Sequence, residues 1–407
     1  MLILDHYRPL VGDEVIGQLE RLAERLGRRR LVHVNSTRTG GGVAEMLQRN
    51  VPILNQLGVD TRWEVIQGDQ TFFEVTKAFH NSLQGLKAVF PPGGMERYLE
   101  INRENARRFT WDADVAVIHD PQPVFVIEHA RRRARHWVWR CHIDISKPDR
   151  QVWALLRKAV IQYDASIFSM PSFSQNLPHP QYLIYPCIDP LSEKNRELSE
   201  EEIQKVLDRL GVERDRPLVL QVSRFDSFKD PLGVIHSFRM VRRHTPCRLL
   251  LVGGEATDDP EGPQIFAKVM EEAQGDPDIQ VLMLPPDSHH EINALQRAAN
   301  IIVQKSIREG FGLTVTEAMW KGKPVIGGAV GGIVMQVRDY QTGFLVHSPE
   351  GCAFRIRYLL RRPELAKKMG QTAREFVRRH FLITRNVRDY LTLMILLENP
   401  NSRVIEV

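Results

Sequence analysis

Two separate blocks of the chain alternate short apolar runs with stretches of helical periodicity. In the first block the expected strands are residues 31–35, 61–66, 115–118, 137–142 and 166–169. In the second block they are residues 218–222, 248–252, 279–284, 301–304 and 324–326. Strands that alternate with helices across tight loops favour a parallel sheet covered by helices on both faces. The pattern therefore predicts an α/β protein with two doubly wound, Rossmann-like domains.

The length of the chain and one break in the pattern place the domain boundary. With 407 residues the chain is too long for one ordinary core, and it fits two domains of roughly 200 residues each. A stretch with two prolines and a polar cluster, residues 185–202, interrupts the alternation. We therefore expect one domain at 1–190 and the other at 191–383. Ligands of such sheets gather at the carboxyl ends of the strands, so both domains are expected to face a central cleft.

Composition and charge narrow the class of protein. Apolar residues make up 43% and charged residues 26%, as in globular proteins. No apolar run approaches the ~20 residues that span a bilayer, and no signal peptide is expected. The four cysteines are scattered without metal-type spacing, which indicates buried thiols in a reducing cytoplasm. The net charge of +5 is mild, and no zinc finger or basic–aromatic stripe is present, so no nucleic-acid or membrane partner is predicted. The arginine run at 131–135 is expected to be the solvated end of a helix.

The segment 308–317 carries the clearest sign of a ligand. Gly310 and Gly312 bracket Phe311 after an apolar strand, and a helix is expected from 313 to 320. The free N–H groups and the positive dipole end of such a helix suit an anion. The flanking carboxylates, Glu309 and Glu317, are good acceptors for sugar hydroxyls. A molecule with phosphate in the middle and a sugar at each end fits this combination, and a sugar nucleotide is such a molecule.

Two cations follow the first strand of the second block. Arg224 and Lys229 lie on the loop after residues 218–222. A departing nucleoside diphosphate gains negative charge as its bond to the sugar breaks, so fixed cations there stabilise the transition state more than the ground state. Taken alone, the pair is typical of solvated surface cations; together with Glu309 and Glu317 it predicts a diphosphate site.

Arg224 and Lys229 followed by Glu309-x7-Glu317 resemble the retaining glycosyltransferases of family 4, which have the two-domain GT-B fold. Nearly the whole chain resembles one family among them, the trehalose glycosyltransferring synthases. The segments that carry this closer likeness are 32–37, 40–45, 119–123, 139–144, 189–195 and 306–333. The resemblance implies transfer of glucose from UDP-glucose or ADP-glucose to free glucose, which gives α,α-trehalose reversibly with retention at the anomeric carbon.

Roles in the second domain follow from the same resemblance, residue by residue. It implies that 191–383 is the donor domain. Arg224 and Lys229 would hold the diphosphate, and Glu317 would accept the ribose hydroxyls. Glu309 would bind hydroxyls of the donor glucose, near the backbone amides of Phe311, Gly312 and Leu313.

Roles in the first domain are implied in the same way. It would be the acceptor domain, with residues 384–407 packing back on it as a helix. Gly41 and Gly42 would let a loop approach the phosphates and the acceptor, where a Cβ would clash. His142 would lie beside the donor sugar as a catalytic residue. The resemblance also implies a front-face displacement, in which the leaving phosphate oxygen takes the acceptor's proton. Weaker candidates for the acceptor site, each with a plain structural alternative, are Asp120, His119 and Glu45; His33 is expected to be structural.

Two positions depart from the family pattern. Asp230 stands where the family usually has glycine after the diphosphate lysine, so its carboxylate either weakens the phosphate site or points away. Gly328 stands where an arginine is expected in the closest relatives, and a supporting contact is then missing.

Alternatives remain open at this stage. The acceptor could instead be fructose, a sugar phosphate or glycerate, or the chain could be a non-catalytic sensor of sugar nucleotides. A nicotinamide-dependent oxidoreductase is disfavoured because no GxGxxG follows the first strand of either block. No cofactor beyond the nucleotide sugar and no metal site are predicted, and Mg²⁺ is expected at most to stimulate. The acidic run 258–261 is interpreted as a capped loop, and a homodimer is expected from the resemblance alone.

Overall fold

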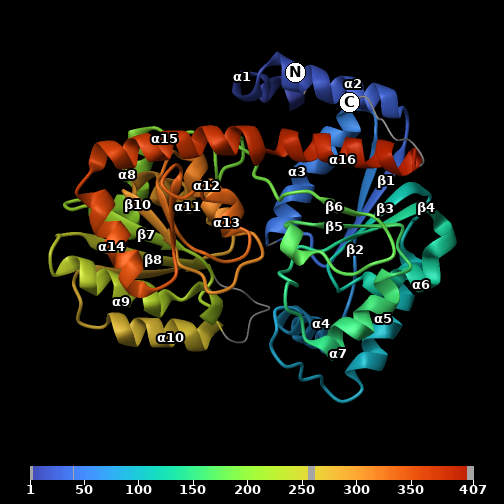
Figure 1. Ribbon diagram of the computed structural model, residues 1–407, viewed down its shortest axis with the longest axis horizontal. Helices are drawn as coiled ribbons and strands as arrows, with labels where there is room; N and C mark the ends of the chain where they lie inside the picture. Colours follow the sequence, from blue (N-terminus) through green and yellow to red (C-terminus); the bar gives the residue numbers. More distant parts are fainter. Residues whose placement is uncertain (1–2, 40, 255–261, 401–407) are drawn as a thin grey trace. The chain divides into compact units, whose positions relative to one another are not determined.

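The computed structural model describes residues 3–39, 41–254 and 262–400. The chain divides into two compact units, which Figure 1 shows in colours that follow the sequence. Unit 1 comprises Met1–Cys187 and Ile383–Val407, and unit 2 comprises Ile188–Leu382. Each unit contains one six-stranded sheet in which all neighbouring strands are parallel.

The sheet of unit 1 has the strand order β2-β1-β3-β4-β5-β6. Its strands are β1 (Arg30–Asn35), β2 (Asp60–Val65), β3 (Ala113–His119), β4 (Ala134–Arg140), β5 (Ala165–Phe168) and β6 (Gln181–Leu183). Its longer helices are α2 (Asp13–Leu26), α3 (Gly42–Gln56), α4 (Gln70–Leu83), α5 (Gly94–Arg108), α7 (Arg150–Val160) and α16 (Ile383–Glu398). Helix α16 packs on α2 and α3, so this helix belongs to the core of the unit. Side chains of β3 and β4 are buried nearly throughout, as expected for strands covered on both faces.

The sheet of unit 2 has the strand order β12-β11-β10-β7-β8-β9. Its strands are β7 (Leu218–Val222), β8 (Arg248–Gly254), β9 (Ile279–Leu284), β10 (Ile301–Gln304), β11 (Val325–Gly328) and β12 (Gly343–Val346). Its longer helices are α8 (Glu200–Leu210), α9 (Pro231–Arg242), α10 (Gly262–Ala273), α11 (His289–Ala298), α12 (Leu313–Trp320), α14 (Pro349–Leu360) and α15 (Pro363–His380). Helix α8 begins with a capping box formed by Ser199 and Glu202. Apolar side chains of β7, β8, β10, α9 and α14 form one continuous core.

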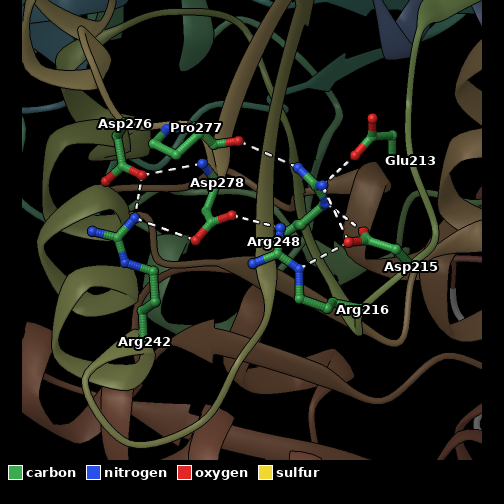
Figure 2. Close-up of polar contacts among 8 residues, drawn as sticks. All are labelled: Glu213, Asp215, Arg216, Arg242, Arg248, Asp276, Pro277 and Asp278. Carbon is green, nitrogen blue, oxygen red and sulfur yellow. Dashed lines mark hydrogen bonds and ion pairs between the residues drawn. The ribbon is translucent and has the colours of Figure 1, made fainter.

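A network of charged side chains joins the amino ends of β7, β8 and β9 (Figure 2). Arg248, at the start of β8, lies 2.6 Å from Asp215 and also pairs with Glu213. Arg216 lies 2.7 Å from Asp278, just before β9. Arg242 at the end of α9 pairs with Asp276 and lies 3.4 Å from Asp278. These ion pairs lie at the end of the sheet opposite to the carboxyl ends of its strands, where a ligand is expected.

Some local expectations were wrong. Arg131–Arg133 form a 3-10 turn, and the chain then becomes extended at Ala134, so Arg135 lies in β4 and not in a helix. Gly343 begins β12, where a Cβ would lie 2.3 Å from the carbonyl oxygen of Val325. Helices α5, α7, α8, α14 and α15 were not anticipated from periodicity. The acidic run 258–261 lies outside the described residues. Within the described ranges, no helix is both long and apolar enough to cross a membrane.

Candidate active site

Lys229 and Glu309 meet at the carboxyl ends of the central strands of unit 2. A 3-10 turn, Ser227–Lys229, follows β7, and the Lys229 ammonium lies 2.6 Å from Oε2 of Glu309. The buried side chain of Gln221 on β7 donates a hydrogen bond to the carbonyl of Lys229 at 2.8 Å. The Ser306 hydroxyl donates to the same Glu309 oxygen at 3.2 Å. Both charged groups are therefore held in defined positions before any ligand binds.

Arg224 remains accessible on the same loop. Its side chain is 44% exposed, and its guanidinium lies 3.7 Å from the buried carboxylate of Asp226. Asp226 also accepts a hydrogen bond from the backbone N–H of Lys229. Burial raises the pKa of Asp226, while the charges of Lys229 and Arg224 oppose that rise. Asp226 thus organises the loop that presents both cations.

The bend after β10 is shaped by close backbone contacts. Gly312 has a φ of 85° and precedes α12, and a Cβ there would lie 3.2 Å from Cγ of Glu309. Gly331 and Gly332 approach this bend from the next loop. A Cβ on Gly331 would lie 1.6 Å from the carbonyl oxygen of Glu309, and one on Gly332 would lie 2.4 Å from Cα of Phe311. Only glycine allows the two loops to come this close.

Gln336, which was not identified from the sequence, holds this bend through hydrogen bonds. Its amide donates to the carbonyl oxygen of Phe311 at 2.5 Å and to that of Gly312 at 3.3 Å. Thr316 donates in turn to its amide oxygen at 2.5 Å. The buried Gln336 thus fixes the two peptide groups whose carbonyls it binds. Together with the first N–H groups of α12, which starts at Leu313, the bend offers an anion site.

Glu317 lines a small cavity of about 160 Å³ beside this bend. Its Oε1 lies 3.6 Å from the Lys194 ammonium. Its Oε2 is buried and has no hydrogen-bond partner in the described part of the chain. A buried acceptor without a donor is costly, so the cavity suits a ligand hydroxyl. Other residues around it include Arg224, Val252, Gly254, Leu284, His289 and Thr314.

A second lysine, Lys321, contacts helix α12, which carries Glu317. The buried ammonium of Lys321 donates to Oδ1 of Asn195 at 3.0 Å and to the backbone carbonyl of Glu317 at 3.3 Å. Burial lowers the pKa of Lys321, and the Glu317 carboxylate opposes this shift. The turn that contains Lys194 and Asn195 therefore anchors the helix that carries Glu317.

Asp230 pairs with a lysine other than Lys229. It has a φ of 50°, which explains why glycine suits this position, and it caps α9 by accepting from the N–H of Gly233 at 3.1 Å. Its carboxylate pairs with the buried ammonium of Lys305. The charge that Asp230 introduces is thus balanced by Lys305, and within the described part of the chain Asp230 forms no ion pair with Lys229.

Gly328 has no room for a side chain. A Cβ at the end of β11 would lie 2.1 Å from the carbonyl oxygen of Ser306. Because Ser306 hydrogen-bonds Glu309, an arginine at 328 would displace the loop that positions this carboxylate. The departure at 328 is a requirement of this packing.

Three histidines of unit 1 form a continuous hydrogen-bonded chain. Nδ1 of His33 lies 2.9 Å from Nε2 of His119, and Nδ1 of His119 lies 3.0 Å from Nε2 of His142. Burial lowers the pKa of all three, that of His33 to about 3. Both ring nitrogens of His119 are occupied, so the direct acceptor contact expected for His119 does not fit this arrangement. His142 is half-buried, two residues beyond β4.

Asp120 lies beside His142, immediately after β3. It has a φ of 64°, and its Oδ1 accepts a hydrogen bond from the backbone N–H of His142 at 2.7 Å. Burial raises the pKa of Asp120 to about 7, against the opposing effect of the Arg140 guanidinium. The structure brings Asp120, His119 and His142 together at the carboxyl ends of neighbouring strands.

The glycine loop of unit 1 precedes α3. Gly41 caps this helix with φ 82° and ψ 155°, a conformation essentially confined to glycine. A Cβ on Gly41 would meet no described atom within 4 Å, so its backbone conformation, and not crowding by the protein, accounts for the glycine. Gly42 begins α3, and Glu45 lies in the first turn of the helix, half-buried.

Comparisons with known protein families give a consistent result. Residues 33–175 match the family described as trehalose synthase, N-terminal domain, and residues 202–376 match glycosyl transferases group 1. A trehalose synthase from Pyrococcus horikoshii is 47% identical over 397 residues, which cover 96% of this chain and 95% of that protein. A trehalose phosphorylase from Pleurotus pulmonarius is 28% identical over 430 residues, which cover 92% of this chain and 58% of that protein.

Solved structures share the architecture. The structure of an α,α-trehalose-phosphate synthase (UDP-forming) from Burkholderia xenovorans superposes with a TM-score of 0.71 at 14% identity. The match covers 90% of this chain and 100% of that chain. A likeness at this level of identity shows the fold, and the two parallel six-stranded sheets are those of the GT-B glycosyltransferases.

Proposed function

We propose that this chain, which belongs to the trehalose synthase family of glycosyltransferases, transfers glucose from a nucleoside diphosphate glucose to free glucose. The product is α,α-trehalose, formed reversibly with retention at the anomeric carbon. The observation that carries the proposal is the pairing of Lys229 with Glu309 beside the start of α12. A cation, a carboxylate suited to sugar hydroxyls and a helix end suited to an anion lie together in unit 2, which supports this reaction.

The donor binds along the groups that surround the Lys229–Glu309 pair. Glu317 offers its unpartnered Oε2 to the ribose hydroxyls, and Arg224 extends from the same cavity toward the diphosphate. The Lys229 ammonium and the amides at the bend meet the phosphate oxygens, while Glu309 turns from Lys229 to the hydroxyls of glucose. A donor of the UDP-glucose or ADP-glucose class satisfies each of these groups. The relative from Burkholderia xenovorans is itself described as UDP-forming, which supports such a donor.

The transfer proceeds on one face of the sugar. The bond from C1 to the leaving phosphate oxygen breaks, and the acceptor hydroxyl forms a new bond to C1 from the same side. The proton of that hydroxyl moves to the leaving phosphate oxygen, so no carboxylate has to form a covalent intermediate. Arg224 and Lys229 stabilise the negative charge that grows on the diphosphate. Both are side-chain cations, so the proposed reaction assigns no step to a metal ion.

The acceptor glucose is assigned to unit 1. Asp120 lies there at a strand end, next to the donor-side residue His142, and offers a carboxyl group suited to the hydroxyls of the acceptor. The 47% identity to a trehalose synthase over almost the whole chain supports glucose as the acceptor.

One assay with product identification tests the proposal. The protein is incubated with UDP-glucose or ADP-glucose and ¹³C-labelled glucose, and the disaccharide is identified by NMR. We expect α,α-trehalose and free nucleoside diphosphate, and in reverse, consumption of trehalose with UDP or ADP. If product forms only with fructose, a sugar phosphate or glycerate, that compound and not glucose is the acceptor. Consumption of trehalose with inorganic phosphate alone would indicate a phosphorylase, and binding without turnover would indicate a sensor.

A further inference from the structure

The chain of histidines in unit 1 runs from the middle of the sheet to the end of its strands. His33 lies in the middle of β1 and is fully buried, His119 ends β3 with 2% of its surface exposed, and His142 is half-buried beyond β4. The rings of His119 and His142 are nearly parallel, 11° apart, as two imidazoles joined edge to edge would be. Outside these contacts, no described residue makes a hydrogen bond to Nδ1 of His142.

The number of protons on the three rings restricts the tautomers that these histidines can adopt. A neutral imidazole has one N–H and one lone pair, and each of the two contacts needs one of each. Either all three rings carry the proton on Nδ1, or all three carry it on Nε2. The tautomers of His33, His119 and His142 are therefore coupled.

The buried end of the row of histidines, at His33, favours one of the two tautomeric states. Nε2 of His33 is buried and has no hydrogen-bond partner in the described part of the chain. The ring of Tyr390 from α16 lies edge-to-face against His33, with 5.4 Å between the ring centroids. A buried N–H without an acceptor is rarer in proteins than an unfilled acceptor. A lone pair on Nε2 is thus preferred, which leaves the proton of His33 on Nδ1, directed at His119.

The state of His142 follows from this choice. His33 donates to Nε2 of His119, so His119 keeps its proton on Nδ1 and donates it to Nε2 of His142. We infer that His33 and His119 are positioning residues that hold His142 with its proton on Nδ1, so that His142 donates a hydrogen bond to a substrate oxygen and does not accept a proton. The identity of that substrate as a sugar rests on the proposed function. This state agrees with a displacement in which the leaving phosphate takes the proton and no protein base is required.

Ionisable groups near the three histidines affect the protonation of all three rings. The groups that face it are the guanidinium of Arg140 in β4, the carboxyl of Asp120 and the phenol of Tyr390. The Arg140 charge disfavours a second positive charge on His119 or His142. Protonation of His142 would also place an N–H on Nε2, facing the N–H of His119. Both effects keep His142 neutral.

NMR of the full chain labelled with ¹⁵N-histidine tests the tautomers without any substrate. Two-bond ¹H–¹⁵N correlations distinguish a proton on Nδ1 from one on Nε2, and single His→Phe variants assign the signals. We expect His142 to carry its proton on Nδ1 and to show no titration between pH 5 and pH 7. A proton on Nε2, or an imidazolium in this range, would overturn the inference whether or not the protein forms trehalose.

Two variants at position 119 separate positioning from mere packing. His119→Phe removes the donor to His142, whose signals should shift to a mixture of tautomers and titrate nearer to the ordinary pKa of His. His119→Gln can supply an amide N–H to the same nitrogen and should restore the Nδ1 proton. If His119→Phe does not fold, His33→Phe provides the second measurement, with a smaller shift in the same direction. His179→Phe, which removes a histidine that bonds Ser166 outside the chain, is the control and should leave His142 unchanged.

Activity provides a second readout. In His119→Phe, turnover should fall by about tenfold or more, with a new pH dependence, because His142 is no longer held in one state. The apparent KM for the nucleotide sugar should change little, and His119→Gln should recover part of the turnover. A uniform loss at every pH, or an Nδ1 proton on His142 that survives in His119→Phe, would show that His119 acts only through packing.

Discussion

The ammonium of Lys229 lies 2.6 Å from Oε2 of Glu309, although 80 positions separate the two residues in the sequence. Both side chains are mostly buried, with 17% and 10% of their surfaces exposed. In the proposed donor complex they bind different parts of one molecule, the diphosphate and the glucose. Without a donor, each satisfies the charge of the other, so the pair keeps the site ordered and is exchanged for ligand contacts on binding.

The pair can be tested by substitution. Lys229→Ala, and likewise Arg224→Ala, should lower kcat by about 10²-fold or more with a modest loss of donor binding, because each cation acts mainly on the departing diphosphate. Glu309→Gln combined with Lys229→Ala should lose less than the sum of the two single losses, since either change alone leaves a buried partner unpaired. Lys205→Ala, which breaks only the exposed pair with Glu201, is the matched control. Turnover at the wild-type level in both cation variants would contradict their roles.

Lys194 should control how Glu317 recognises ribose. Its ammonium lies 3.6 Å from Oε1 of this buried carboxylate, and without it Glu317 loses an adjacent positive charge and a contact that positions its side chain. We expect Lys194→Met to bind UDP about tenfold more weakly and to lose part of the preference for UDP over 2′-deoxy-UDP, as measured by titration calorimetry. Lys194→Arg keeps the charge and should retain that preference. An undiminished preference in Lys194→Met would rule out this role.

Asp230 and Lys305 should matter for stability more than for catalysis. Asp230→Asn keeps a residue that tolerates the positive φ, but it leaves the buried Lys305 ammonium without its counter-charge. We expect the free energy of unfolding to fall by about 1–3 kcal/mol, measured by urea unfolding with circular dichroism. The double variant Asp230→Asn with Lys305→Met should recover most of the loss. If the single variant is as stable as the wild type, the ion pair makes no net contribution to the free energy of unfolding.

The buried histidines should make unit 1 sensitive to acid. The pKa of His33 is lowered from 6.5 to about 3, so between these values the unfolded chain binds a proton that the folded chain does not. Stability is therefore complete above about pH 6.5 and declines as the pH falls toward 3, at up to about 1.4 kcal/mol per pH unit for each such histidine. His119 and His142 act in the same direction.

Asp120 should oppose this trend. Its pKa is raised to about 7, so the folded chain binds the extra proton between pH 4 and pH 7 and gains stability as the pH falls. The slope of stability against pH should become shallower in His33→Leu and steeper in Asp120→Asn, by about one proton each. Urea unfolding followed by tryptophan fluorescence measures this, because five of the six tryptophans lie in unit 1. Identical slopes in wild type and both variants would contradict the assignment.

Much of the fold could be read from local patterns. Strands β7, β9 and β10 and helix α12 begin and end at the predicted residues, because a run of apolar residues bounded by polar turns specifies a buried strand without further information. Helices α5 and α15 were missed, since their many charged residues obscure the apolar stripe. The kinds of residues at the candidate site could also be predicted, because two cations, taken together with a glycine bend and two carboxylates, indicate binding of phosphate and sugar.

The sequence by itself determined the two α/β blocks, the positions of Arg224, Lys229, Glu309 and Glu317, and the glycines of the bend. Only the tertiary structure decided which charges meet: Lys229 with Glu309, Lys194 with Glu317, and Asp230 with Lys305. It also joined His33, His119 and His142 across three neighbouring strands. The physical reason is that a local pattern records hydrophobicity and backbone preference over a few residues. Pairing of polar groups depends instead on which strand ends the sheet order brings side by side.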